Sequence, residues 1–338
     1  MKKLLTIAGL VLAAVAANAG TITVTAPAAG TAANPTPVGS STTVQFQLRD
    51  MVSQARVSAT VRRVSDNTVF TNIPEVSINP DPSNRTGSGT LTVSFPQGSP
   101  EVVYRVEVRA RDINNSTTYN QDQNLFLRPD LTKPKILQFN PVSGAFVKGI
   151  VPIRVQISET NLKDWRVQVD GQDIPNNTGT TVDANGRFIV NWDTSGLQTD
   201  GPRTINVRIR DEADNEESQN INVTVDRVAP IVTIQTPRSG SVIAPGTTIA
   251  VTVDVADFSA TSVDFTGVDV VIRTTAGAFV TRVARQSFNQ LNGTTRRWVG
   301  RIRWSNTLPS SFRITATAVD KAGNRTNTPQ TVTVTIGR

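Results

Sequence analysis

Apolar and polar residues alternate along three stretches of this chain, and the three stretches read nearly alike. They are YRVEVRARD from residue 104, RTINVRIRD from residue 203 and FRITATAVD from residue 312. Alternation with a period of two predicts a β-strand with one buried face. Each stretch ends in an aspartate whose side chain can cap the turn that follows. These aspartates are Asp112, Asp211 and Asp320.

A second alternating segment follows each turn, so each stretch predicts a β-hairpin. The second segments are residues 124–130, 220–226 and 331–337. Repeats spaced by roughly 100 residues are whole domains and not units of a solenoid. Short strands with frequent turn signals and no convincing helix predict three antiparallel β-sandwiches, an all-β fold. The predicted domains are residues 20–131, 132–228 and 229–338.

One large aromatic residue lies upstream of each hairpin, at Phe95, Trp192 and Trp304. Around the third, Trp298, Gly300, Ile302 and Trp304 alternate with Arg297, Val299, Arg301 and Arg303. The tryptophan side is therefore expected to face the core. An exposed aromatic platform that stacks on a sugar is the alternative.

Two segments carry a resemblance to a known family. The second copy has WDTSGLQTDGPRTINVRIRDEADN at 192–215, and the third has VDKAGN at 319–324. The junction DRVAP at 226–230 separates these copies. Together they resemble the bacterial immunoglobulin-like (Big-type) tandem repeats of exported and cell-surface proteins. The resemblance implies Ig-like sandwiches joined by short Pro-containing linkers, which we expect to form a semi-rigid rod. The first copy matches less well, because Asp112 is followed by Ile-Asn-Asn instead of Ala-Gly-Asn.

The N-terminus predicts export. Two lysines precede an apolar run that ends in Ala17-Asn18-Ala19, the pattern of a secretory signal peptide over residues 1–19. We expect no transmembrane segment in the mature chain, because no later stretch is apolar enough to span a bilayer. The predicted location is the periplasm, the cell surface or the medium.

The composition narrows the possible chemistry. The chain has no His and no Cys, which excludes Ser-His-Asp and Cys-His nucleophile arrangements. A carboxylate pair remains formally possible, yet no pairing can be recognised from spacing. We therefore expect a protein that is not an enzyme and that needs no organic cofactor.

An acidic cluster predicts one possible metal site. The hairpin turn of the second copy is rich in carboxylates, and Asp226 lies in the linker beyond it. Calcium takes six to eight oxygen ligands, and such a cluster near a domain end could supply them. The alternative is a solvated turn in which aspartates cap backbone groups. The candidate Ca²⁺ ligands are Asp211, Asp214, Asn215, Glu216 and Asp226.

Charge is uneven along the chain. Residues 229–338 hold twelve basic and five acidic side chains, a net charge of +7, whereas the other two predicted domains are near neutral or slightly acidic. If the strands concerned are neighbours, their arginines form one basic sheet face that attracts an anionic partner. The alternative is an ordinary solvated surface, since Arg outnumbers Lys throughout. The candidate anion-binding residues are Arg273, Arg297, Arg301, Arg303 and Arg313.

These features predict an exported, non-enzymatic protein that presents a binding or adhesion surface in the cell envelope. The expected partner of the third domain is an anionic envelope component or another surface protein. We expect no specific recognition of nucleic acid, because no base-reading motif is visible. One alternative is a structural spacer or assembly subunit of a larger surface complex, such as a pilus, an adhesin or a surface layer. A second alternative is a carbohydrate-binding module.

Overall fold

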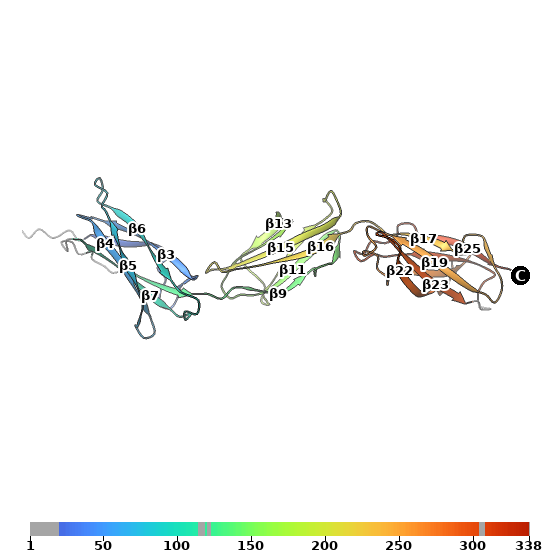
Figure 1. Cartoon of the computed structure of the whole chain (residues 1–338), viewed down its shortest axis with the longest axis horizontal. Coiled ribbons are helices and arrows are strands. Elements are labelled where there is room, and N and C mark those ends of the chain that lie inside the picture. Colours follow the sequence, from blue (N-terminus) through green and yellow to red (C-terminus); the bar gives the residue numbers. More distant parts are fainter. Residues whose placement is uncertain (1–19, 114–118, 120–122, 304–307, 338) are drawn as a thin grey trace, which may run out of the picture. The chain divides into compact units, whose positions relative to one another are not determined.

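The structure is a computed structural model that describes residues 20–113, 119, 123–303 and 308–337, and the described residues contain strands and no helix. The backbone divides into two compact units. One unit holds the first β-sandwich and the turn at residues 210–216, and the other holds the remainder of the second sandwich and all of the third. Figure 1 shows the strands coloured along the sequence and labels several of them in each sandwich.

The described residues of the first sandwich form eight strands in two sheets. One sheet has the order β1-β3-β6 and the other has the order β2-β8-β7-β4-β5. The strands are β1 (Thr21–Ala26), β2 (Thr36–Val38), β3 (Ser41–Arg49), β4 (Ala55–Arg63), β5 (Val69–Ile78), β6 (Gly87–Ser94), β7 (Tyr104–Asp112) and β8 (Gln123–Pro129).

The second sandwich repeats this plan. Its sheets have the orders β14-β11-β9 and β10-β16-β15-β12-β13. The strands are β9 (Lys135–Asn140), β10 (Phe146–Val147), β11 (Ile150–Ser158), β12 (Leu162–Val169), β13 (Gln172–Gly179), β14 (Arg187–Asp193), β15 (Gly201–Asp211) and β16 (Glu216–Val225).

The third sandwich has one more strand, added to its smaller sheet. The sheets have the orders β17-β19-β23-β22 and β18-β25-β24-β20-β21. The strands are β17 (Ile231–Thr236), β18 (Ser241–Ile243), β19 (Thr248–Ala256), β20 (Asp269–Thr274), β21 (Phe279–Arg282), β22 (Ala284–Gln290), β23 (Thr295–Arg303), β24 (Ser311–Thr317) and β25 (Gln330–Ile336).

All three sandwiches share one connection that is typical of Ig-like folds. The chain enters one sheet, crosses over, and places a short second strand in the other sheet. That short strand lies parallel to the last strand of its own domain, in the pairs β2 with β8, β10 with β16 and β18 with β25. The strands on either side of these pairs run antiparallel within the described residues, as in β11 with β14, β19 with β23 and β3 with β6, which confirms the prediction of three tandem Ig-like antiparallel sandwiches.

Each sandwich encloses its own hydrophobic cluster, built from the inward side of the alternating strands. Phe95 and Trp192 are buried in the first and second clusters, as predicted. Trp298 and Ile302 are buried on one side of β23, whereas Arg301 and Arg303 on the other side are exposed. The three described tryptophans, Trp165, Trp192 and Trp298, are all at most 8% exposed, so none forms an open sugar platform. Trp304 lies outside the described residues.

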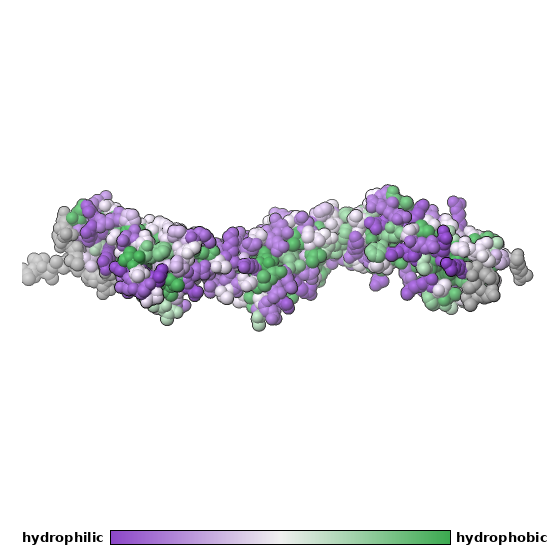
Figure 2. All heavy atoms as spheres, turned by 60° about the horizontal axis from the view of Figure 1, so that its bottom comes forward, coloured by the Kyte–Doolittle hydropathy of each residue, from purple (hydrophilic) through white to green (hydrophobic). Residues whose placement is uncertain are grey.

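The surface is mainly polar on the face drawn in Figure 2, where hydrophilic residues surround small hydrophobic groups. A search of the described residues finds no helix with the length and hydropathy needed to cross a membrane. Residues 1–19, predicted to be a signal peptide, lie outside the described part of the chain.

Candidate functional site

The acidic turn of the second sandwich is built around Asp211, which is fully buried. Its Oδ1 accepts hydrogen bonds from the backbone N–H groups of Ala213 and Asn215, at 2.9 and 2.8 Å. Its Oδ2 accepts a third, from Asn215 Nδ2 at 2.8 Å. The carboxylate therefore caps the turn backbone, which is the alternative that the sequence left open beside calcium binding.

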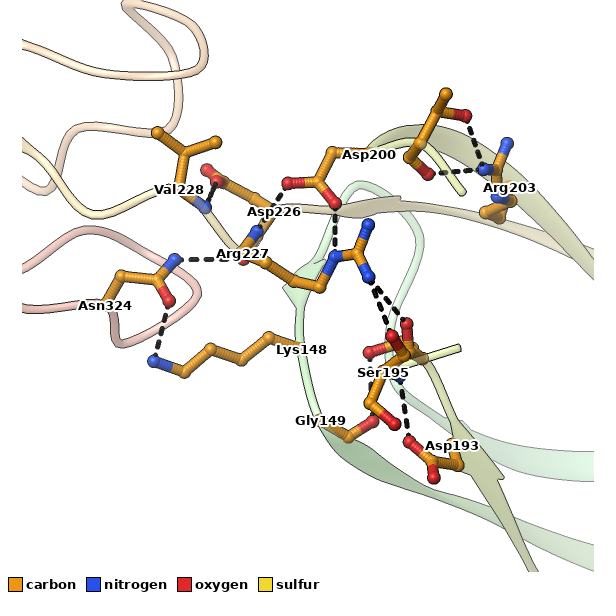
Figure 3. Close-up of polar contacts among 12 residues, drawn as sticks. Lys148, Gly149, Asp193, Ser195, Asp200, Arg203, Asp226, Arg227, Val228 and Asn324 are labelled. Carbon is orange, nitrogen blue, oxygen red and sulfur yellow. Dashed lines mark hydrogen bonds and ion pairs between the residues drawn. The ribbon is translucent and has the colours of Figure 1, made fainter. Parts of the chain in front are cut away.

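The turn of the third sandwich repeats this arrangement. Asp320 accepts hydrogen bonds from the backbone N–H and the side-chain Nδ2 of Asn324, both at 2.7 Å. Asn324 Nδ2 also donates to the backbone carbonyl of Asp226 at 2.9 Å, and its Oδ1 accepts from Lys148 Nζ at 2.9 Å. Figure 3 shows Asn324 between Lys148 and the linker residue Asp226. The side-chain amide of Asn324 thus connects the last turn of the third sandwich to two places in the second. These are the β10–β11 turn, through Lys148, and the linker after β16, through Asp226.

The linker itself is held by ionic contacts. Arg227 Nε lies 2.6 Å from Asp200 Oδ1, and the backbone N–H of Arg227 donates to Asp200 Oδ2 at 2.8 Å. The guanidinium also donates to the carbonyl of Thr194 and to that of Ser195, which Figure 3 labels. These contacts of Arg227 are all with residues of the second sandwich.

Three aspartates meet beside this linker. Asp226 follows β16, Asp257 follows β19, and Asp320 lies beyond β24. One carboxylate oxygen of each lies within 4.8 Å of the other two. Their residues are 0%, 9% and 3% exposed. Among the residues that the structure describes, this is the single group of three or more acidic side chains whose oxygens could share one ion.

Each carboxylate of this triad, Asp226, Asp257 and Asp320, has some partners. Asp257 Oδ1 accepts from the backbone N–H of Phe258 and Oδ2 accepts from Ser262 Oγ, both at 2.8 Å. Asp226 Oδ1 accepts from the backbone N–H of Val228 at 3.1 Å, but its Oδ2 is buried without a hydrogen-bond partner.

The electrostatics of the triad reflect crowded negative charge. Burial, and next the charge of Asp257, raise the pKa of Asp226 to about 6. Burial also raises the pKa of Asp257, and the charge of Asp320 adds to the effect. Both shifts disfavour the ionised carboxylates in the absence of a compensating charge.

The predicted calcium ligands are not brought together as a set. Asp211 serves as a cap, and Asp214 contacts Arg210 at 3.8 Å. Of the five predicted residues, only Asp226 belongs to the triad, whose other members are Asp257 and Asp320. Asp257 was missed because a single acid after a strand gives no local motif. The available signal was that each of the three aspartates comes at the end of an alternating segment of the sequence, and the ends of such segments can meet where the second sandwich joins the third.

The predicted basic face is also divided, because its arginines lie on different sheets. Arg297, Arg301 and Arg303 lie on β23, whereas Arg273 and Arg313 lie on β20 and β24 of the opposite sheet. The single basic face expected from the sequence is therefore corrected to two arginine groups. The reason is that β23 pairs with β19 and β22, and β24 pairs with β20 and β25.

The arginines of the two groups have different hydrogen-bond partners. Arg297 makes a two-bond ion pair with Asp254, at 2.7 and 2.8 Å, across the β19–β23 ladder. Arg273 stands directly opposite Arg313 in the β20–β24 register and donates to the carbonyl of Gly277 at 3.1 Å.

The exposed end of β23 borders a groove. Arg301 and Arg303 line it, together with Arg282, Thr281 and Gln286. The groove lies where the edge strands β21 and β22 of the two sheets approach each other. Within the described part of the chain, no acidic side chain forms an ion pair with Arg301 or Arg303, whereas Arg282 pairs with Asp269 at 3.0 Å. The groove could bind an anion through guanidinium groups.

No protein-family model matches the chain. Halomucin of Haloquadratum walsbyi is 32% identical over 122 residues, which are 36% of this chain and 1% of that protein. The chain thus spans about 1% of the length of this curated relative.

Several solved structures are similar to this chain in part. Fibronectin(III)-like modules of CbhA from Clostridium thermocellum match with a TM-score of 0.36 and 15% identity, over 60% of this chain and 93% of theirs. A structure from a 1.5-MDa bacterial ice-binding adhesin matches with a TM-score of 0.32 and 16% identity, over 89% of this chain and 95% of that one. The strand order and register identify the sandwiches as Ig-like.

Proposed function

We propose that this chain is an exported, non-enzymatic protein whose tandem sandwiches present a binding surface in the cell envelope. The signal-like sequence at residues 1–19 supports export. The lack of His and Cys supports a role in binding instead of nucleophilic catalysis. The third sandwich is the docking module in this proposal, and its partner is an acidic envelope polysaccharide.

The observation that carries the proposal is the groove bordered by Arg301 and Arg303. Both side chains are exposed, and neither is neutralised by a described acid. They belong to the domain that holds the whole positive excess of the mature chain. Arginine forks bind carboxylates through two parallel hydrogen bonds, which suits a polymer of uronic acids.

The experiment measures binding of the protein to immobilised alginate, a polyuronate, by biolayer interferometry over a series of NaCl concentrations. The test variant is Arg301→Glu/Arg303→Glu. The matched control is Arg273→Glu/Arg313→Glu, which changes the net charge equally but on the opposite sheet. The same proteins are then tested for retention on isolated cell envelopes.

We expect salt-sensitive binding that falls at least about tenfold in the groove variant and about threefold or less in the control. Equal losses in both variants would mean that only net charge matters, and the groove assignment would be wrong. Absence of binding to alginate and to envelopes would overturn the docking function altogether.

A spacer or assembly subunit is the second candidate function. The observation that favours it is the junction held by Asn324, Lys148 and Asp226, which ties the second sandwich to the third. A spacer needs such a fixed connection and no exposed ligand site. It predicts that both charge variants are retained on envelopes as well as the unmodified protein.

A further inference from the structure

We infer that Asp226, Asp257 and Asp320 bind one Ca²⁺ at the junction between the second and third sandwiches. The site differs from the acidic turn that the sequence suggested, because two of its ligands come from the third sandwich. The inference is independent of the basic groove, so it can fail or succeed without the docking function.

Negative charge is concentrated in this triad. Three buried carboxylates within 4.8 Å of one another repel strongly unless a cation or protons compensate them. No described Lys or Arg forms an ion pair with any of the three. The nearby cations are used elsewhere: Lys148 binds the amide oxygen of Asn324, and Arg227 binds Asp200. A divalent cation would supply the missing positive charge.

One carboxylate oxygen of the triad has no hydrogen-bond partner. Asp226 is completely buried, and its Oδ2 accepts no hydrogen bond. A buried carboxylate oxygen without a partner has lost its hydration and gained no bond in exchange, which is unfavourable. Because Asp226 Oδ2 accepts no hydrogen bond, its lone pairs are available to coordinate a cation.

The spacing of the carboxylate oxygens suits a calcium ion. Calcium holds oxygens at about 2.3–2.6 Å, so two ligands on opposite sides of the ion lie at most about 5 Å apart. The separations in the triad, at most 4.8 Å, meet this limit. Ser262 Oγ, already bonded to Asp257 Oδ2, is a neighbouring neutral oxygen, and waters can complete a shell of six to eight.

The types of ligand decide which ion the triad would bind. All three ligands are carboxylates, which suit hard cations, and there is no imidazole or thiolate anywhere in the chain. Mg²⁺ is smaller and demands near-ideal octahedral geometry, whereas Ca²⁺ accepts an irregular and flexible shell. Three carboxylates and one hydroxyl from separate segments of the chain form an irregular set of ligands, which favours Ca²⁺ over Mg²⁺.

The experiment titrates CaCl₂ into EDTA-treated, dialysed protein by isothermal titration calorimetry, with MgCl₂ in a parallel titration. Thermal unfolding with and without Ca²⁺ gives a second readout. The test variants are Asp226→Asn and Asp257→Asn, which keep the side-chain shape. The matched control is Asp211→Asn, since Asp211 is an equally buried aspartate that caps the corresponding turn of the second sandwich.

We expect one Ca²⁺ per chain with a Kd of about 1 mM or tighter, and at least tenfold weaker binding of Mg²⁺. Each test variant should weaken Ca²⁺ binding at least tenfold, while Asp211→Asn should leave it unchanged. Asp257→Asn should also raise the unfolding temperature of the calcium-free protein, because it removes one repelling charge. This second readout keeps the test valid if Asp226→Asn folds poorly.

Three outcomes would overturn the inference. The unmodified protein could give no heat and no thermal shift at 10 mM CaCl₂. The Asp257→Asn protein could bind as tightly as the unmodified one. Equal affinity for Mg²⁺ and Ca²⁺ would overturn the assignment of calcium.

Discussion

Replacing Asn324 by alanine should destabilise the third sandwich and its connection to the second. The side chain is 7% exposed and makes three hydrogen bonds, to the Asp226 carbonyl, to the Asp320 carboxylate and from Lys148. The backbone hydrogen bond from residue 324 to Asp320 would remain. The substitution therefore removes the contacts between the second and third sandwiches, while the backbone hydrogen bond that caps the turn is retained.

The magnitude follows from these bonds. A neutral hydrogen bond contributes about 1 kcal/mol and one to a charged group about 1.5–3 kcal/mol. The Lys148 contact is discounted, because this half-buried ammonium can be rehydrated. The total is about 2–4 kcal/mol of unfolding free energy. With a urea slope of about 2 kcal/mol/M, the midpoint should fall by about 1–2 M.

The assay is urea unfolding followed by tryptophan fluorescence in EDTA, so that no bound cation contributes. All four tryptophans lie between residues 165 and 304, so the signal reports the second and third sandwiches. Asn220→Ala, at an exposed asparagine that accepts one bond from Asn206, is the control and should shift the midpoint by less than about 0.3 M. A shift for Asn324→Ala as small as that of the control would refute the bridging role.

Three further predictions concern the cores and the surface charges. Phe95→Ala should destabilise the first sandwich by about 3–5 kcal/mol, because Phe95 is fully buried against other aromatic rings; thermal unfolding by circular dichroism measures this. The Arg297–Asp254 pair is partly exposed, so Arg297→Ala should cost about 1 kcal/mol or less, and 1 M NaCl should shrink the difference in urea midpoints. Hydrogen bonds from Arg166 and its neighbours lower the pKa of Asp173, so the stability that this carboxylate adds is present above pH 4 and is lost as the pH falls further. The Asp173→Asn protein should therefore lose less stability between pH 5 and pH 2 than the unmodified protein, as measured by urea midpoints at each pH.

The alternation of residues was enough to predict the strands and their inward faces. On β23 the burial of Trp298 and the exposure of Arg301 follow directly from a period of two. The capping role of Asp211 could also be foreseen, because it depends on backbone groups only two to four residues away. Such local features need no knowledge of which strands are neighbours.

The partners of each strand could not be read from the sequence. Alternation says which side of a strand is buried, but the pairing of β23 with β19 and of β24 with β20 is set by how whole sheets pack. For this reason the predicted basic face combined arginines that lie on two different sheets. The triad was missed for the same reason, because Asp226, Asp257 and Asp320 are far apart in the sequence and come together only in the folded chain.

The short parallel strands have a mechanical consequence. In the second sandwich β10 lies near the entry of the chain and β16 immediately precedes its exit, and the two run parallel, with Phe146 opposite Thr224. Tension applied at the two ends of this domain would pull the paired strands in opposite directions along their shared ladder. Their hydrogen bonds would then be loaded together in shear, and not opened one after another. The pair formed by β18 and β25 would bear force in the same way in the third sandwich.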